Sequence, residues 1–372
     1  MVDSGKVKQR EYNVDTGSQS YQVVWCSKAS ASQRAGRAGR TGPGHCYRLY
    51  SSAVFDQQFP DYAQPEIKRV PIESLVLQLK SMGIDNPKNF PLPSQPDMDA
   101  VEQAEKLLCQ LKALSLQPNS GTLKITKLGS LMSSIPLAPR WSKLLILACQ
   151  DFIDDQIKLD DLSLVIAMVS IIAVGDPFFE SHGVETTQFG KKNILKTLPK
   201  PASSDIFIWL QAVLSYNSLQ PANRMTFANE NGLMQKKLDE SLLQFNQIRN
   251  LLGQLFTHIV DFGSLPSSIT RRSIPYLRQS LSDALPDRIA ERTKVIGEKS
   301  SQPAYRLLKK VNGDAPSESA DMVLYLHSSS CLSGCPPRYV VFNESITTEK
   351  KTLLKVVTAI EQSWIPSEFL LA

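Results

Sequence analysis

The sequence contains no apolar run long enough to cross a lipid bilayer, and its cysteines are few and scattered. The most apolar stretch, LSLVIAMVSIIAV over 162–174, is shorter than a membrane span and ends at a Gly-Asp-Pro stop, so it predicts a buried helix. Six cysteines among 372 residues, after a start that does not resemble a secretory signal, indicate reduced thiols rather than a disulfide framework. These features favour a cytosolic or nuclear protein with no membrane partner.

Two motifs of nucleotide-hydrolysing enzymes are also absent from the sequence. There is no G-x-x-x-x-G-K-[ST] loop, whose backbone would cradle phosphates, and no D-E-x-H box, whose carboxylates would hold Mg²⁺. The chain opens with MVDSGKVKQREY, which is typical of the end of a strand with no cap or linker before it. We therefore expect a fragment or truncated product that cannot complete a nucleotide site by itself.

Charge is unevenly distributed along the chain. The formal net charge is +5, and residues 1–50 carry eight Lys and Arg against three Asp and Glu, while the remaining residues carry 33 of each sign. This distribution predicts that an anionic partner contacts mainly the N-terminal end.

The order of the expected elements indicates a multidomain α+β protein. Two alternating runs around DTGSQS predict a β-hairpin over 6–25, followed by a helix and a short strand. This strand–helix–strand unit is too small to be a complete α/β domain. Two amphipathic helices over 64–84 and 97–114, followed by a hairpin around Pro118–Gly121, favour a winged helix. Residues 141–262 predict a helical bundle, and the short strands that begin near 273 fit a small Greek-key barrel.

The strongest local signal is the basic run QRAGRAGR, which begins at Gln33. On a helix, Gln33, Arg37 and Arg40 lie at positions i, i+4 and i+7 and share one face. Gly36 and Gly39 each cost about 1 kcal/mol inside a helix, so their presence indicates the close approach of another backbone or a bulky ligand. Two guanidiniums and an amide in one row suit a triphosphate. A solvated basic helix is the alternative interpretation.

The run and its flanks resemble motif VI of the superfamily 2 DEAH-box (DEAH/RHA) RNA helicases. The matching positions are Gln33, Arg34, Gly36, Arg37, Gly39 and Arg40. VDSGKVKQREYN and VVWCSKASASQ resemble the family's segment between motifs V and VI, which carries a protruding strand-separating hairpin. Later segments, among them VIAMVSIIAVGDPFF and YVVFNESITTEKK, are similar to the family's helical bundle and OB-fold, so the resemblance covers essentially the whole chain.

The resemblance implies four units. These are the C-terminal remnant of a second RecA-like domain (1–66), a winged helix (67–140), a ratchet-like helical bundle (141–268) and an OB-fold barrel (269–372). It also implies that the cofactor of the complete enzyme is ATP with Mg²⁺. Arg37 and Arg40 would then be arginine fingers with Gln33 beside them, and Gly36 and Gly39 would line the nucleotide. We expect this chain alone to bind no nucleotide tightly.

The resemblance further implies NTP-driven translocation along single-stranded RNA from 3′ to 5′. The stretch NFPLPSQPD over 89–97 is similar to the branch that works in small-subunit ribosome biogenesis. The expected partners are therefore pre-rRNA or small nucleolar RNA and activator or ribosome-assembly proteins, and no DNA. The expected location is the nucleus, specifically the nucleolus. The alternative is a truncated, non-catalytic RNA- or protein-binding module.

Basic residues outside the arginine run are candidates for RNA contact. Lys6, Lys8 and Arg10 lie on the expected hairpin, where they would contact the RNA backbone. The nearby Tyr12, Tyr21 and Trp25 would lie against bases. Arg271, Arg272 and Lys309 lie in or beside the expected barrel. The alternatives are an ordinary solvated hairpin and solvated surface pairs.

A spaced set of His327, Cys331 and Cys335 could suggest zinc, but the sequence offers no nearby fourth ligand. We therefore interpret these residues as part of a turn between two barrel strands and predict no metal site.

Overall fold

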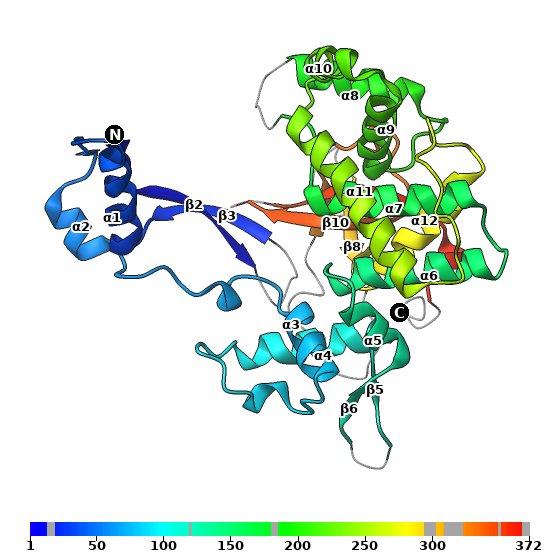
Figure 1. Ribbon diagram of the computed structural model, residues 1–372, viewed down its shortest axis with the longest axis horizontal. Coiled ribbons are helices and arrows are strands. Elements are labelled where there is room, and N and C mark those ends of the chain that lie inside the picture. The colour runs from blue at the N-terminus through cyan, green and yellow to red at the C-terminus, as the bar shows by residue number, and fades with distance from the viewer. Residues whose placement is uncertain are drawn as a thin grey trace.

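The computed structural model describes residues 1–12, 19–118, 121–179, 185–293, 303–308, 323–348 and 351–366. It is a mixed α+β structure with a small N-terminal unit, a helical region and a barrel, which confirms the predicted fold class. Figure 1 shows the N-terminal unit, in dark blue, set apart from the helices, with one hairpin reaching from it toward the barrel.

The N-terminal unit contains a short parallel pair of strands, β1 (Val2–Asp3) and β4 (Tyr47–Arg48). The remaining elements are the hairpin β2 (Lys6–Tyr12) and β3 (Gln19–Trp25), the helices α1 (Lys28–Gly36) and α2 (Ser52–Gln58), and the 3₁₀ turn η1 (Arg37–Gly39). Its small core centres on Cys26, Ala31 and Phe59, while Val2, Tyr47 and Leu49 are each about two-thirds exposed. Parallel sheets are ordinarily covered on both faces, whereas this two-stranded pair leaves apolar side chains uncovered. Its assignment as the remnant of a second RecA-like domain stays a prediction.

Residues 66–133 form helices around a short hairpin. The elements are η2 (Glu66–Lys68), α3 (Glu73–Ser81), η3 (Pro87–Asn89), α4 (Met98–Gln110), β5 (Leu114–Leu116), β6 (Leu123–Ile125) and α5 (Lys127–Ser133). Helices followed by a β-hairpin are the parts of a winged helix, and that assignment stays a prediction.

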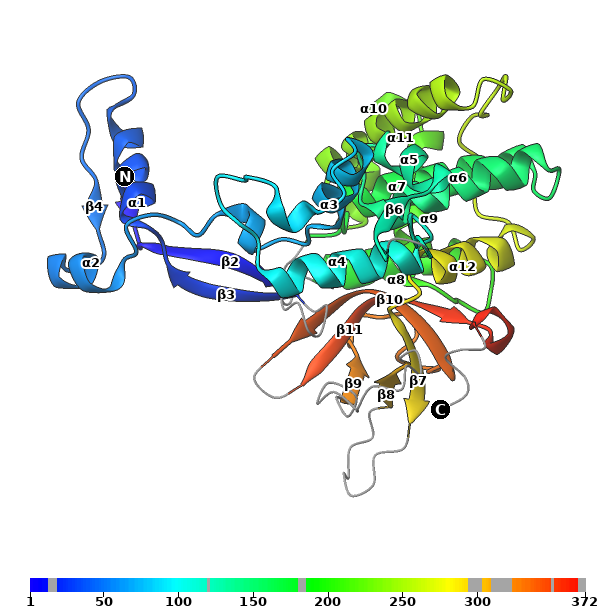
Figure 2. The same ribbon diagram turned by 90° about the horizontal axis from the view of Figure 1, so that it is seen from below.

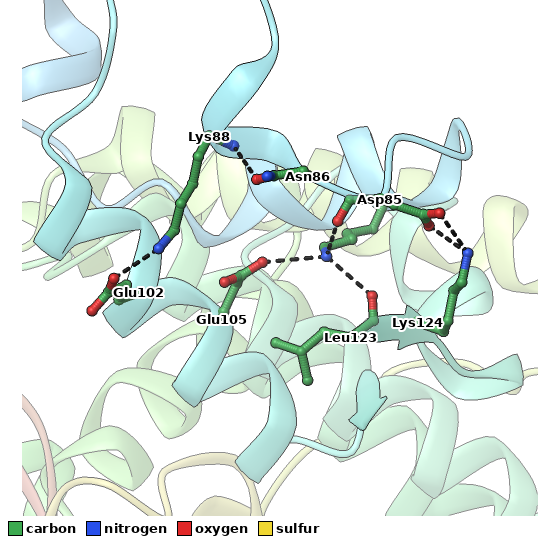
Figure 3. A network of polar contacts seen from close by, with 8 residues as sticks. Asp85, Asn86, Lys88, Glu102, Glu105, Leu123 and Lys124 are labelled. Carbon is green, nitrogen blue, oxygen red and sulfur yellow. Dashed lines mark hydrogen bonds and ion pairs between the residues drawn. The ribbon is translucent and has the colours of Figure 1, made fainter. Parts of the chain in front are cut away.

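A buried lysine holds this part together, as the polar network in Figure 3 shows. The Lys80 ammonium donates to the carbonyl oxygens of Asp85 (2.7 Å) and Leu123 (3.0 Å) and lies 3.2 Å from a Glu105 carboxylate oxygen. One side chain on α3 therefore ties together a loop, strand β6 and helix α4. Its charge is buried but fully partnered, as a buried ammonium requires.

The helical region is built around α7 (Leu159–Val174), which is buried along most of its length and confirms the predicted buried helix. The surrounding helices are α6 (Pro139–Ile153), α8 (Glu185–Thr197), α9 (Asp205–Ser218), α10 (Pro221–Glu230), α11 (Gln235–Leu255) and α12 (Ser273–Ala284). Within the described ranges, no helix is long and apolar enough to cross a membrane.

Five strands of the described chain close a barrel, which confirms the predicted OB-like fold. They are β7 (Ile289–Thr293), β8 (Ala304–Leu307), β9 (Val323–Leu326), β10 (Tyr339–Thr347) and β11 (Thr352–Ile360), with the turn η5 (Gln362–Trp364) after them. The order is β7-β8-β9-β11-β10, and β10 returns to β7. The β9–β11 pair is parallel and the other barrel pairs are antiparallel. Figure 2 shows the bundle helices gathered on one side of this barrel.

The helices and the outside of the barrel share one apolar core. A single cluster of buried side chains extends from Ile72 on the approach to α3, through the bundle, to Ile365 after the last strand. The barrel interior, with Tyr305, Val340 and Val357, forms a second cluster. Burial of this extent is the main source of stability, so the three C-terminal parts fold against one another.

A buried carboxylate joins the bundle to the barrel. Asp205, in the first turn of α9, accepts hydrogen bonds from the backbone N–H groups of Cys331 (2.8 Å) and Val357 (2.9 Å) and from the Ser330 hydroxyl (3.1 Å). The preceding residue of β11, Val356, has φ 56°, a strained value for a β-branched residue. We attribute this strain to the turn of the Val357 N–H toward the Asp205 carboxylate.

A second link between bundle and barrel is ionic. Arg140 on α6 donates to both carboxylate oxygens of Asp287, at 2.7 and 3.1 Å, just before β7. Burial alone would raise the pKa of Asp287, but the attraction and hydrogen bonds of Arg140 outweigh it and lower that pKa from 3.8 to about 2.

Replacing Asp287 with Asn should lower the free energy of unfolding by about 2 kcal/mol at pH 7, because Asn removes the negative charge that Asp287 places against the Arg140 guanidinium. Because folding lowers the pKa of the Asp287 carboxyl, the charged carboxylate stabilises the folded state at pH values above its pKa in the unfolded chain. This stabilisation is lost as the pH falls through the pKa of the folded state. The difference between wild type and D287N should therefore shrink between about pH 4 and pH 2. Thermal unfolding at several pH values measures it. The matched control is E102Q, which removes an exposed ion pair with Lys88 and should change stability by less than about 1 kcal/mol; equal losses in both variants would contradict the prediction.

We predict that residues 1–60 are the least stable part of the described chain, because their core is small and their parallel strands are two residues long. Amide hydrogen exchange should be faster in α1 and β4 than in α6 and α7. Protection of α1 equal to that of α7 would contradict this.

Candidate functional site

Helix α1 begins at Lys28, directly after Ser27. The Ser27 hydroxyl accepts a hydrogen bond from the Ser30 N–H at 3.1 Å and caps the first turn. Ala31 on the inner face is fully buried. The opposite face, which carries the basic run, is thereby turned toward solvent.

The predicted row is present, with a change of helix type along it. Gln33 lies in the last turn of α1, and Arg37 and Gly39 bound the 3₁₀ turn, so the expectation of one continuous α-helix through Gly39 was wrong. Residues three apart eclipse each other in a 3₁₀ turn, and Arg40 keeps right-handed helical angles (φ −73°, ψ −38°). The tighter turn therefore keeps Arg37 and Arg40 in line instead of breaking the row.

Gln33, Arg37 and Arg40 are exposed, and none of them makes a side-chain hydrogen bond or ion pair within the described ranges. Arg34, one position from Gln33, differs: its guanidinium donates to the Asp3 carboxylate (3.1 Å) and the Lys6 carbonyl (3.2 Å). The run therefore contains one arginine that holds the unit together and two whose charges are uncompensated.

The glycines of the run face open space. A methyl group added at Gly36 or Gly39 would meet no atom of another part of the described chain within 4 Å. The close approach that these glycines predict is therefore not made inside this structure. The surface at Gly36 and Gly39, which carries no side chains, remains accessible to a ligand or to another domain.

This surface fits one side of a triphosphate site. Two guanidiniums and an amide would hold phosphate oxygens by charge-assisted hydrogen bonds. The phosphate loop and the Mg²⁺ carboxylates of such a site are not in this sequence. The assignment of Gln33, Arg37, Arg40, Gly36 and Gly39 to nucleotide contact stays a prediction.

The hairpin places the predicted RNA residues on one strand face. Lys6, Lys8 and Arg10 alternate along β2, so these positions share a face. They pair across the hairpin with Trp25, Val23 and Tyr21, respectively. The paired positions combine basic with apolar or aromatic residues, and their contact with RNA stays a prediction.

Trp25 has a different role from the one expected. Its ring stacks on Phe59 at 5.1 Å, its N–H donates to Gln58 at 2.7 Å, and the Lys6 ammonium lies 3.1 Å from the ring centroid. These contacts make Trp25 part of the small N-terminal core. The idea that it stacks on an RNA base has no support in this geometry.

The hairpin also contacts the barrel. Gln19 of β3 pairs in parallel with Ile346 of β10, so the hairpin extends the barrel sheet (Figure 1). The element that begins beside the arginine row therefore ends against the OB-like barrel.

The remaining candidates lie elsewhere. Arg271 and Arg272 are exposed on the turn before α12, and Lys309 lies outside the described residues. His327, Cys331 and Cys335 lie in the loop between β9 and β10, as predicted. The His327 ring bonds to the Ser329 hydroxyl at 2.7 Å, and no group of three potential metal ligands occurs in the ranges that the structure describes.

Comparison with known proteins agrees with this geometry. Residues 277–369 match the family described as the oligonucleotide/oligosaccharide-binding (OB)-fold. The chain is 35% identical over 403 residues to the human probable ATP-dependent RNA helicase DHX37, an alignment that covers 99% of this chain and 32% of that protein. The chain corresponds to the C-terminal region of a DEAH-box-type ATP-dependent RNA helicase.

Two further relatives of this helicase family support the assignment. The Drosophila melanogaster probable ATP-dependent RNA helicase kurz is 33% identical over 391 residues, covering 98% of this chain and 31% of that protein. The Saccharomyces cerevisiae probable ATP-dependent RNA helicase DHR1 is 48% identical over 192 residues, covering 52% of this chain and 14% of that protein. The alignments with the human and Drosophila proteins cover nearly all of this chain, but the chain spans only about a third of the length of each of those helicases.

The double variant R37A/R40A should bind single-stranded RNA within twofold of wild type if the arginine row serves phosphates of a nucleotide. Fluorescence anisotropy with a labelled oligonucleotide measures the affinity. K8A/R10A on the hairpin, with the same loss of charge, is the matched comparison and should bind more weakly. If R37A/R40A lost as much RNA affinity as the hairpin variant, the arginine row would bind RNA rather than a nucleotide, and the prediction would be wrong.

Proposed function

We propose that this chain provides one side of the ATP site and the RNA-gripping modules of an ATP-dependent RNA helicase. The observation that carries the proposal is the exposed row of Gln33, Arg37 and Arg40, whose two charges have no partner in the described structure. The helicase relatives, which match the chain over nearly its full length, support it.

In the complete site, bound ATP with Mg²⁺ would supply the phosphoryl group whose transfer to water releases energy. Arg37 and Arg40 would stabilise negative charge on the oxygens of that group, and Gln33 would orient the group or the attacking water. The 3₁₀ turn places Arg37 and Arg40 three residues apart along one face, and the glycine positions leave room for the other side of the site to approach.

The RNA-gripping part of the proposal rests on the hairpin and the barrel. Lys6, Lys8 and Arg10 would contact the RNA backbone from one strand face. An OB-fold barrel is a common platform for single strands. Because the hairpin runs from the arginine-bearing unit to β10, a change at the ATP site would move the RNA contacts. The resemblance to DEAH-box helicases implies that such movements drive 3′-to-5′ translocation and unwinding in the complete enzyme.

We further propose that the enzyme acts in pre-rRNA processing and small-subunit assembly in the nucleolus. The resemblance of residues 89–97 to that branch of the family supports this. Pre-rRNA or small nucleolar RNA would be the substrate, and activator or ribosome-assembly proteins the partners.

The alternative is a non-catalytic RNA- or protein-binding module. The missing phosphate loop and acidic box favour it for this chain acting alone, and the barrel would be its RNA-binding element.

The purified 372-residue chain should release phosphate from ATP no faster than buffer does, with or without RNA, because it lacks the groups that would cradle the phosphates and Mg²⁺. A coupled phosphate-release assay measures the rate, and R37A/R40A is the control for contaminating ATPase activity. Release above background that R37A/R40A abolishes would show that the chain completes a site by itself and would overturn the prediction.

A further inference from the structure

Helix α8 is fixed to the bundle by one face. A Cβ at Gly190 would lie only 2.0 Å from the Asn231 carbonyl oxygen, so only glycine permits this close contact with the turn before α11. Ile194, one helical turn further on, is 4% exposed, and Leu198 after the helix is also buried. The orientation of α8 about its own axis is therefore set by packing.

The opposite face of α8 carries an aromatic ring and two lysines. Phe189, Lys192 and Lys196 occupy positions i, i+3 and i+7, which lie within about 60° of one another around a helix. Phe189 is 59% exposed, and both lysines are exposed. We call these three residues the α8 surface.

The charges of the α8 surface are uncompensated. Neither Lys192 nor Lys196 has an ion pair within the parts of the chain that the structure describes. Their neighbour Lys191 shows the contrast, because its ammonium lies 3.7 Å from an Asp176 carboxylate oxygen and 4.8 Å from the Phe178 ring. Lys191 therefore has a structural role that the other two lack.

The local composition favours an anionic partner. Residues 185–200 contain four lysines and one acidic residue, Glu185, one turn before Phe189. A second exposed ring, Phe179, is held beside the same bundle turn by its N–H bond to the Gly232 carbonyl (3.1 Å). An exposed ring beside lysines suits a nucleobase and its phosphates.

We propose that the α8 surface is an RNA-binding site, in which Phe189 stacks on a base and Lys192 and Lys196 contact phosphates of the same single strand. This inference rests on the proposed RNA binding and assigns part of it to the helical bundle. An acidic protein segment would use the lysines as well, but every nucleotide of RNA offers both a planar base for Phe189 and a phosphate for a lysine, so RNA fits the three residues better.

The test uses the full 372-residue chain and a fluorescein-labelled 20-nucleotide oligouridylate in anisotropy titrations at several salt concentrations. F189A should weaken binding about tenfold, as expected for the loss of one stacked base. K192A/K196A should weaken binding and reduce the slope of log affinity against log salt by about 1.4, since each phosphate contact on a single strand contributes about 0.7.

The matched control is K106A/K127A, which removes two exposed lysines of α4 and α5 and the same net charge. Thermal unfolding midpoints of all variants show whether the fold is kept, which is expected because the replaced side chains are exposed. Affinity and slope should stay close to wild type in the control.

Three outcomes would overturn the inference: unchanged RNA affinity in F189A and K192A/K196A, equal losses in K192A/K196A and K106A/K127A, or displacement of RNA by an acidic peptide with no dependence on Phe189. In each of these the wild type still binds RNA and the proposed function survives. If the wild type binds no RNA at all, the proposed RNA binding fails first, and the inference with it.

Discussion

The arrangement of the C-terminal parts depends on the buried carboxylate of Asp205. It sits on the bundle but takes its hydrogen bonds from the barrel: from the loop before β10 through Cys331, and from the middle of β11 through Val357. A carboxylate in such a place is costly unless every acceptor is used, and here three donors satisfy it. The strained Val356 is the local cost of bringing one of those donors into position. The bidentate contact between Arg140 and Asp287 adds a second fixed point at the other end of the same interface.

The fold class and most of the order of elements were predictable because they follow from local pattern. The expectation of strands from about residue 273 was wrong, because Ser273–Ala284 forms helix α12 and the first barrel strand begins at Ile289. Alternation identified the hairpin and barrel strands, and the apolar run at 162–174 identified α7, since periodicity and burial act over a few residues. The type of helix at Arg37 and the role of Trp25 were not predictable. The first depends on a choice between two backbone geometries of similar energy, and the second on Phe59 and Gln58, which lie more than thirty residues away.

In the candidate site, too, local sequence predicts some features, and contacts between distant residues determine the others. Motif spacing placed Gln33, Arg37 and Arg40 in a row, but only the structure separates Arg34, paired with Asp3, from its neighbours. The α8 surface went unnoticed because the local excess of lysines over 185–200 is hidden in the neutral total charge of residues 51–372. The signal was present in the spacing of Phe189, Lys192 and Lys196, and it becomes informative once the contact at Gly190 shows which face is buried.

The continuous core from Ile72 to Ile365 has a mechanical consequence. Parts that share one packed interior cannot move relative to each other without disrupting that interior. The helices and the barrel therefore behave as one rigid unit. We therefore expect relative movement in residues 60–71, where the chain forms only the short turn η2 and no residue is buried. Because β3 pairs with β10, such a movement would displace strand β10 at the edge of the barrel, where Gln19 pairs with Ile346.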